Sequence, residues 1–336
     1  MEAGFKWGTA SDNLNNTAEG SISGDSFSAS LSGLSAGTTY CYQAYVTVQG
    51  TEDKTFTGEV KEFTTGYKIP AMLEVPATKT GYIYAGHGIG DGTDLNKGPD
   101  RNYNYCYDIS RYAALWVAYP LTNAHTKGSV PTPNWEYDTN IDSKYQPAIT
   151  GNSYGTVYNN SDYSRGHQCP NASRKSDATM NSQTYYASNQ TPQLQNKFNS
   201  GIWSAFENAV RALTTNRSDT LYVATGPCYQ TVGGSEEVTW LTAKETSTVP
   251  YEIPLANYYW KAVLKIKTVN GYITDACAIG IWLEHKAYES SDYTPYIVSI
   301  DEIEAKTGFD LFSGLPDVLE KSAEKARPTW TEFQKF

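Results

Sequence analysis

Two short stretches of the chain combine residue types that can move a proton and hold a metal ion. The first covers residues 164–174, in which His167 follows Arg165 and Gly166. The second covers residues 199–211, which offer an amide, a carboxylate and a guanidinium. Histidine has an ordinary pKa of about 6.5, so it is largely neutral at pH 7 and can accept a proton. Amide and carboxylate oxygens are ligands that a hard cation such as Mg²⁺ prefers.

Each stretch has a plainer interpretation when it is taken alone. Arg-Gly-His is a weak motif, and an isolated histidine is more often structural than catalytic. Asn199 could cap a helix, and Glu207 with Arg211 could form a surface ion pair one helical turn apart. The chemical interpretation therefore depends on the two stretches lying together in the fold.

Residues 199–213 form the strongest predicted helix of the chain. Four apolar residues recur at helical spacing and should be buried, namely Ile202, Phe206, Val210 and Leu213. A second set recurs every fourth residue and stacks on the neighbouring face: Asn199, Trp203, Glu207 and Arg211. The polar face should thus lie at the margin of the core, where a cleft can form. We expect Trp203 to pack there rather than to stack on a substrate.

The order and spacing of these residues closely resemble the DNA/RNA non-specific endonucleases, the ββα-metal group that includes endonuclease G. That family carries Asp-Arg-Gly-His, then Asn-x-x-Pro-Gln about thirty residues later, then Asn-x-x-x-Trp-x-x-x-Glu. This chain has Arg-Gly-His at 165–167, Asn-Gln-Thr-Pro-Gln at 189–193, and Asn199 placed 32 residues after His167. The likeness covers most of residues 80–320 and extends to five further stretches, at 115–119, 225–227, 259–261, 301–304 and 314–316.

The resemblance implies a mechanism for hydrolysing phosphodiesters. Asn199 would be the only direct protein ligand of Mg²⁺, with Mn²⁺ as a substitute, and Glu207 would hold waters bound to the ion. His167 would deprotonate the attacking water, while Arg165 and Arg211 neutralise the phosphate. The ion would stabilise the leaving 3′ oxygen, which gives 5′-phosphate ends. A site that contacts only phosphate and metal reads no base edges, so DNA and RNA would both be cut without sequence preference.

Two departures from the family pattern affect this expectation. Ser164 stands where the family has an aspartate, and we expect weaker positioning of the loop without loss of activity. An arginine that some members supply from the preceding segment has no clear counterpart at residues 133–135. Neutralisation of the phosphate would then rest more on Arg165 and Arg211, or on an arginine elsewhere such as Arg101.

Other polar residues near the motifs are expected to support the site. Asn189 and Gln193 should fix the loop before the helix rather than touch substrate. Arg174 is equally compatible with a phosphate contact and with a solvated position. The remaining histidines match no catalytic position and should be structural: His87, His125 and His285.

Composition and charge limit the class of protein. A net charge of −10 over 336 residues argues against holding nucleic acid by bulk electrostatics, but an enzyme that turns nucleic acid over needs only a local basic cleft. The five cysteines lie far apart, form no zinc motif, and are expected to be small buried hydrophobes. A surface rich in Tyr and Asn and poor in Lys is typical of exported bacterial proteins, whether periplasmic, cell-surface or secreted. The export signal or anchor would then lie outside this sequence, which has no apolar run of membrane-spanning length.

The sequence predicts two domains. Residues 1–66 read as short alternating strands and resemble part of a fibronectin type III sandwich, with Tyr40 near the tyrosine-corner position. Its partner is unknown. Residues 67–336 are expected to form an α+β nuclease domain of mixed antiparallel sheets and helices, including a strand at 219–229 and a hairpin at 258–282 across Asn270-Gly271. Ser299 is expected to cap a short helix.

Two other functions remain compatible with the sequence. One is a cell-surface binding or adhesion protein whose nuclease-like domain has lost activity, which the acidic charge and Ser164 permit. The other is a phosphodiesterase of the same fold that acts on small nucleotides. The joint presence of His167, Asn199 and Glu207 favours the nuclease over the inactive protein.

Overall fold

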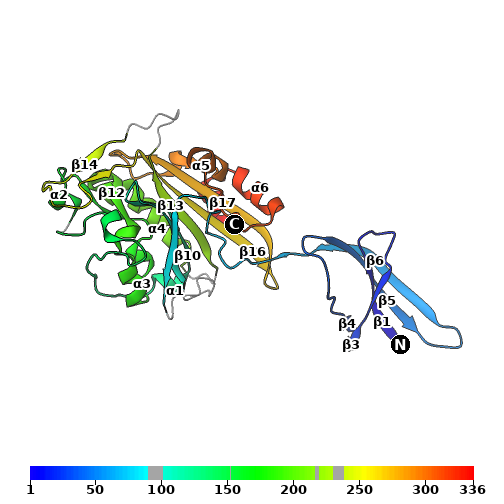
Figure 1. The fold of residues 1–336 in the computed structure, drawn as a ribbon. Helices are drawn as coiled ribbons and strands as arrows, with labels where there is room; N and C mark the ends of the chain where they lie inside the picture. Colours follow the sequence, from blue (N-terminus) through cyan, green and yellow to red (C-terminus); the bar gives the residue numbers. More distant parts are fainter. Residues whose placement is uncertain (90–100, 152, 216–218, 230–237) are drawn as a thin grey trace. The chain divides into compact units, whose positions relative to one another are not determined.

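The chain divides into two compact units in the computed structural model, which describes residues 1–89, 101–151, 153–215, 219–229 and 238–336 (Figure 1). One unit comprises Met1–Ile69 with Lys267–Asp275, and the other comprises Pro70–Ile266 with Ala276–Phe336. We predicted a boundary near residue 66. The smaller unit runs three residues further and adds the tip of a later hairpin.

The smaller unit consists of antiparallel strands. Its main sheet has the order β2-β1-β5-β6, with bounds Asn16–Glu19, Glu2–Gly8, Thr39–Val48 and Lys54–Thr64. The short strands are β3 (Ser21–Ser23), β4 (Ser26–Ser28) and β7 (Tyr67–Lys68). The Tyr40 hydroxyl accepts a hydrogen bond from the Ser35 backbone N–H at 3.0 Å, which ties β5 to the connection before it, as a tyrosine corner does. The assignment to the fibronectin type III fold stays a prediction.

An antiparallel sheet forms the centre of the larger unit, in the order β18-β17-β16-β13-β10-β9-β8. In that order the strands span Ile297–Val298, Tyr272–Glu284, Tyr258–Val269, Leu221–Cys228, Ala113–Leu121, Arg101–Asp108 and Ile83–Gly88. The predicted hairpin is confirmed, since Asn270 and Gly271 have φ angles of 51° and 79°. Positive φ at both central residues is what the tight hairpin turn requires.

The helix predicted over residues 199–213 is regular only in its second half. The α-helix α4 spans Ser204–Ala212, and the π-helical segment η5 (Gln195–Trp203) precedes it. The backbone of η5 is non-helical at three residues, including Lys197 with φ 64° and Gly201 with ψ −115°. These conformations interrupt the hydrogen-bond ladder, so Asn199 lies on an irregular segment. The prediction of one continuous helix was wrong there.

The remaining elements are short. The helices are α1 (Asn123–Thr126), α2 (Tyr154–Val157), α3 (Ala178–Gln183), α5 (Ile300–Thr307), α6 (Asp317–Lys325) and α7 (Trp330–Lys335). The 3-10 turns are η2 (Ser143–Tyr145), η3 (Asn171–Ser173), η4 (Ala187–Asn189) and η6 (Thr294–Tyr296). The paired strands outside the central sheet are β11 (Tyr163–His167) with β12 (Gln190–Leu194), and β14 (Trp240–Thr242) with β15 (Glu252–Pro254). The predicted cap is confirmed, because the Ser299 hydroxyl accepts from the Glu302 backbone N–H at the start of α5.

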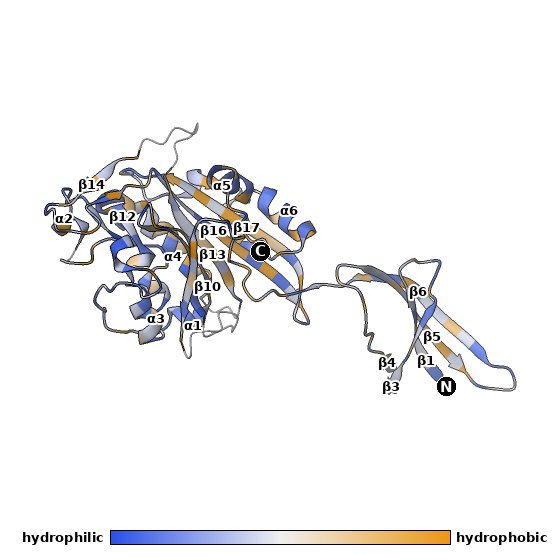
Figure 2. Ribbon diagram, in the orientation of Figure 1, coloured by the Kyte–Doolittle hydropathy of each residue, from blue (hydrophilic) through white to orange (hydrophobic). Residues whose placement is uncertain are grey.

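The core joins the central sheet to α4. The apolar stripe predicted from helical spacing is buried and packs with sheet residues such as Val117, Val223 and Val263. Apolar colouring runs along β16 and β17 in Figure 2, as expected of strands that face a core. The α+β class expected from the sequence agrees with this mixture of sheet and helices. Within the described residues, the helices are too short or too polar to cross a bilayer.

Candidate active site

The two central motifs are neighbouring strands. Gly166 on β11 lies opposite Thr191 on β12, and His167 lies opposite Gln190. A Cβ atom at position 166 would come within 2.1 Å of the Gln193 side chain, which is fully buried. Glycine is therefore required between the arginine and the histidine, because the glutamine of the second motif crosses that point. The pairing explains physically why the two motifs occur together.

His167 ends β11 and lies between two aromatic rings. Its ring centroid is 4.9 Å from that of Trp135 and 4.7 Å from that of Tyr185. Burial, with a smaller contribution from Lys175, lowers the pKa of His167 to about 4. The Nε2 atom is buried and has no hydrogen-bond partner among the described residues. A neutral imidazole with an uncommitted nitrogen can accept a proton at neutral pH.

Asn199 presents its side-chain carbonyl oxygen. The amide Nδ2 donates to the Ser164 hydroxyl at 3.0 Å and to Gln195 Oε1 at 3.1 Å. The Oδ1 atom accepts no hydrogen bond from a described residue, so it is available as an oxygen ligand for a hard cation. Ser164 and His167 lie three residues apart on β11, or roughly 10 Å along a strand. A hydrogen bond thus joins Asn199, on η5, to the short strand that ends in His167.

Ser164 therefore has a definite contact at the position where the family has aspartate. Its hydroxyl donates to the Gln193 carbonyl at 3.3 Å while accepting from Asn199. A serine hydroxyl can do both, because it carries one donor and two acceptor lone pairs. The replacement retains a link between β11, β12 and Asn199.

Glu207 lies near two cations at the edge of the core. Its Oε1 is 3.7 Å from Lys261 Nζ and its Oε2 is 4.0 Å from Arg211 NH1. Burial raises the pKa of Glu207, and the charges of Lys261 and Arg211 oppose that rise. The expected ion pair with Arg211 thus exists, but it is mostly buried, with side-chain exposures of 16% and 13%. Arg211 NH1 has no hydrogen-bond partner among the described residues, so it remains available to an anion.

Lys261 is the residue of this site that the sequence reasoning missed. Its side chain is fully buried, 4.8 Å above the Trp203 ring and 5.9 Å from that of Tyr119. Burial lowers its pKa to about 8, although the neighbouring Glu207 opposes that shift. The sequence signal was a lysine within residues 258–264, which are otherwise aromatic or aliphatic, because a buried charge needs a partner. Trp203 itself is 1% exposed, in agreement with the expected packing role.

We expect Lys261→Met to lower the free energy of unfolding by roughly 3 kcal/mol, because it leaves a largely buried carboxylate without its nearer cation. The double variant Lys261→Met/Glu207→Gln removes that orphaned charge and should lose less than the sum of the two single losses. Urea unfolding of the wild type, both single variants and the double variant measures the coupling. If the double variant loses as much unfolding free energy as the two single variants together, Lys261 and Glu207 do not stabilise one another.

Three arginines considered for phosphate binding are occupied by protein atoms. Arg165 donates to the carbonyls of residues 148, 150 and 151 at 2.8–3.3 Å and is 5% exposed. Arg174 is fully buried and bonds to Asn102 and to the Pro120 carbonyl. Arg101 forms an ion pair with buried Glu74. These contacts favour a supporting role for all three, and the phosphate role expected of Arg165 stays a prediction.

The amides of the second motif support the loop, as expected. Asn189 Oδ1 accepts from the Cys169 backbone N–H at 2.8 Å, and its Nδ2 donates to the Cys169 and Thr184 carbonyls. This clamp fixes the backbone just after His167. Gln193 packs across Gly166, as described above. Both side chains are fully buried, so they hold the loop in position and do not contact a substrate.

The other histidines are held by protein contacts, in agreement with their expected structural role. His87 Nε2 lies 2.8 Å from the buried Asp138 carboxylate. His285 accepts from the Leu194 backbone N–H at Nε2, so its Nδ1 must carry the proton shared with the Ala256 carbonyl. His125 is buried, and its Nδ1 lies 3.1 Å from the Thr122 backbone nitrogen. All five cysteines are outside disulfides, and four of them, including Cys169, are buried.

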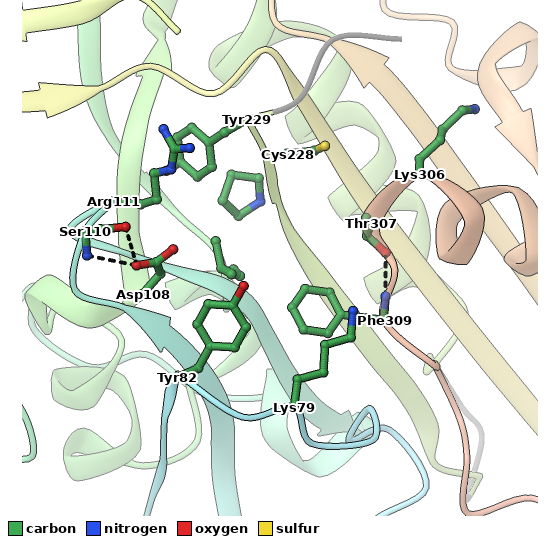
Figure 3. Close-up of a pocket in the computed structure, with 12 residues that line it drawn as sticks. Lys79, Tyr82, Asp108, Ser110, Arg111, Cys228, Tyr229, Lys306, Thr307 and Phe309 are labelled. Atoms are coloured by element: carbon green, nitrogen blue, oxygen red, sulfur yellow. Dashed lines mark hydrogen bonds between the residues drawn. The ribbon is translucent and has the colours of Figure 1, made fainter. Parts of the chain in front are cut away.

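A pocket of about 200 Å³ lies elsewhere and contains none of the predicted site residues (Figure 3). Its walls carry three basic side chains, from Lys79, Arg111 and Lys306. Lys79 lies 4.6 Å over the Phe309 ring, and Arg111 lies 5.4 Å over that of Tyr229. Two of the three basic groups thus lie over aromatic rings of the wall.

Comparison with known proteins shows the family of the chain. The profile of the DNA/RNA non-specific endonuclease family matches residues 90–318. The chain belongs to the DNA/RNA non-specific endonuclease family. It is accordingly an enzyme that hydrolyses nucleic acid, and its family implies a divalent metal cation.

Individual relatives are distant but cover much of the chain. A nuclease of Serratia marcescens is 30% identical over 222 residues, covering 64% of this chain and 74% of that protein. A nuclease of Nostoc sp. is 25% identical over 267 residues, covering 76% and 89%. A chain in the crystal structure of the EndoG/EndoGI complex superimposes with a TM-score of 0.53 at 20% identity, covering 65% of this chain and 86% of that one. The superposition shows the shared fold.

Proposed function

We propose that this nuclease cuts both DNA and RNA with little regard for sequence, with Mg²⁺ as its cation and Mn²⁺ as a substitute, and leaves 5′-phosphate ends. One observation carries the proposal: a hydrogen bond from Nδ2 ties Asn199 to Ser164 on the strand that ends in His167, and the Asn199 carbonyl oxygen accepts no hydrogen bond from a described residue. A single oxygen ligand suits Mg²⁺, which keeps several of its waters.

The donor set fits such a cation. Asn199 Oδ1 would hold it directly, and Glu207 Oε1, which is buried and without a hydrogen-bond partner among the described residues, would hold its water shell. When bound, the cation supplies charge neutralisation on the phosphoryl and leaving oxygens. The charge of Lys261, 3.7 Å from Glu207 Oε1, favours the ionised form of this carboxyl, which can accept hydrogen bonds, and so opposes the burial that raises its pKa.

The remaining groups act on the substrate. His167 accepts the proton of the attacking water at Nε2, and the rings of Trp135 and Tyr185 hold the imidazole in place. Arg211 neutralises the phosphate through its NH1 atom, which is buried beside Glu207 and has no hydrogen-bond partner among the described residues. These groups recognise the phosphodiester and not the base edges, which is the physical basis for tolerance of sequence.

Metal removal tests the proposal directly. Supercoiled plasmid and total RNA should both disappear in the presence of Mg²⁺ and persist in EDTA, and added Mn²⁺ should restore cleavage. End-labelling of the products distinguishes 5′-phosphate from 3′-phosphate ends. The proposed function is contradicted if the protein leaves both polymers intact under each divalent cation, or if it cuts only small phosphodiesters.

The rate of cleavage should remain high well below pH 6.5. Burial holds the pKa of His167 down at about 4, and a general base works only when deprotonated. Its contribution is therefore present above that pKa and lost as the pH falls through it. A kcat/KM profile from pH 3.5 to 8 measures the acid limb, and Glu207→Gln removes the one carboxyl group of the proposed site, so that its titration cannot be mistaken for that of His167. An acid midpoint at 6.5 or above in both proteins would contradict the assignment.

A further inference from the structure

Five carboxylates converge where α5 and α6 lie side by side (Figure 1). Oxygen atoms of Asp301, Glu304 and Glu324 lie within 4.8 Å of one another, and so do those of Asp310, Glu320 and Glu324. Glu324 belongs to both groups and is the centre of the cluster. None of the five takes part in the nuclease site described above.

Glu324 is the independent indication of a ligand. It is 6% exposed, and its Oε1 atom is buried without a hydrogen-bond partner among the described residues. Its carboxylate points toward the four others, since one of its oxygens lies within 4.8 Å of theirs. A buried carboxylate is normally paired or bound to a metal.

The charges around Glu324 do not provide that partner. Burial, with smaller contributions in the same direction from Glu304, Glu320 and the two aspartates, raises the pKa of Glu324 to about 9. The pKa of Glu304 is raised to about 7, again by burial and then by acidic neighbours, although a backbone hydrogen bond from Leu311 opposes this. Like charges one helical turn apart, as at Glu320 and Glu324, destabilise a helix by themselves. The cluster therefore needs either protons or a cation.

We propose that these five residues, which we call the α5–α6 carboxylate site, bind a hard divalent cation, with Ca²⁺ favoured over Mg²⁺. Calcium accepts six to eight oxygen ligands from carboxylates in flexible geometry, whereas magnesium demands a regular octahedron and retains its waters. Asp301 and Glu304 come from α5, Glu320 and Glu324 from α6, and Asp310 from the connection between them. The bound ion clamps the two helices together and stabilises the folded chain.

Thermal unfolding in an Asn199→Ala background isolates this site from the catalytic cation. A few millimolar Ca²⁺ should raise Tm by on the order of 5 °C relative to EDTA, because a ligand that binds only the folded state stabilises it. Glu324→Gln, which keeps the shape of the side chain and removes its charge, should abolish that rise. Glu245→Gln, which removes an exposed carboxylate outside the cluster, should keep it. Isothermal titration of Ca²⁺ should give one binding event that is lost in Glu324→Gln.

The result that overturns the proposal is equally distinct. An unshifted Tm and no calorimetric binding of Ca²⁺ or Mg²⁺ in the Asn199→Ala protein would show that Glu324 holds a proton instead. If Glu324→Gln does not fold, Asp310→Asn at the exposed edge of the site provides the test, and an undiminished Ca²⁺ response there would also overturn it. None of these readouts uses nuclease activity, so failure of the proposed function leaves them interpretable.

Discussion

His167→Ala should lower kcat/KM for plasmid DNA and for RNA by about 10²- to 10⁴-fold, the usual contribution of a general base. The imidazole is neutral because burial lowers its pKa to about 4, and its Nε2 is uncommitted within the described residues. Within the described part of the chain, the rings that contact it belong to Trp135 and Tyr185, and neither is an imidazole that could replace it. The loss should fall equally on both substrates, because the base acts on water and not on the sugar.

A second buried histidine provides the matched control. His125→Ala removes a buried imidazole whose side-chain hydrogen bonds among the described residues go to Thr122 at the local helix start, and we expect cleavage within a few-fold of the wild type. Tm measurements on both variants separate a loss of chemistry from a loss of fold. A His167→Ala protein that retains more than a tenth of the wild-type kcat/KM would remove this residue from the role of base.

Asn199→Ala should raise the Mg²⁺ concentration needed for half-maximal cleavage by roughly 10- to 100-fold or more, on the scale of losses seen when groups around a metal are removed. The reason is geometric. Hydrogen bonds from Nδ2 to Ser164 and Gln195 fix the amide so that Oδ1 is the atom left open. The measurement is a Mg²⁺ titration of the initial rate at saturating DNA.

Asn199→Asp separates the role of the oxygen ligand from that of the hydrogen bonds that hold the side chain in place. Aspartate keeps an oxygen ligand but cannot donate to Gln195, so its Mg²⁺ requirement should lie between those of the wild type and Asn199→Ala. Ser164→Ala removes the acceptor at 3.0 Å together with the 3.3 Å hydrogen bond to the Gln193 carbonyl, and it should cause a smaller shift of the same kind. An unchanged titration curve in Asn199→Ala would exclude Asn199 as the ligand, whatever the residual rate.

The contacts in the structure, and not sequence position, decide which charged residues belong to the site. Arg165 lies beside His167 in sequence and was expected to meet the phosphate, yet three backbone carbonyls occupy its guanidinium. Side-chain direction along β11 depends on what packs against the strand, and sequence spacing does not reveal it. Lys261 shows the converse: it lies 54 residues after Glu207, and only the packing of β16 beneath α4 makes the two neighbours.

Local signals in the sequence determined the elements whose causes are local. Asn270-Gly271 specified the hairpin turn, Ser299 with Glu302 specified a helix start, and the apolar stripe ending at Leu213 specified a buried helix face. Motif order by itself also identified the family and singled out His167 and Asn199. Each of these depends on interactions within a few residues, or on a pattern that can be read along the chain.

Only the tertiary structure decided what depends on contacts between distant segments. It interrupted the expected helix at η5, placed the Asn199 amide on Ser164, and paired Glu207 with Lys261. It also gathered five carboxylates from two helices and their connection around Glu324. The physical reason is the same in each case: burial and electrostatic partnership are set by residues far apart in sequence, whereas spacing reports only which residues share a local face.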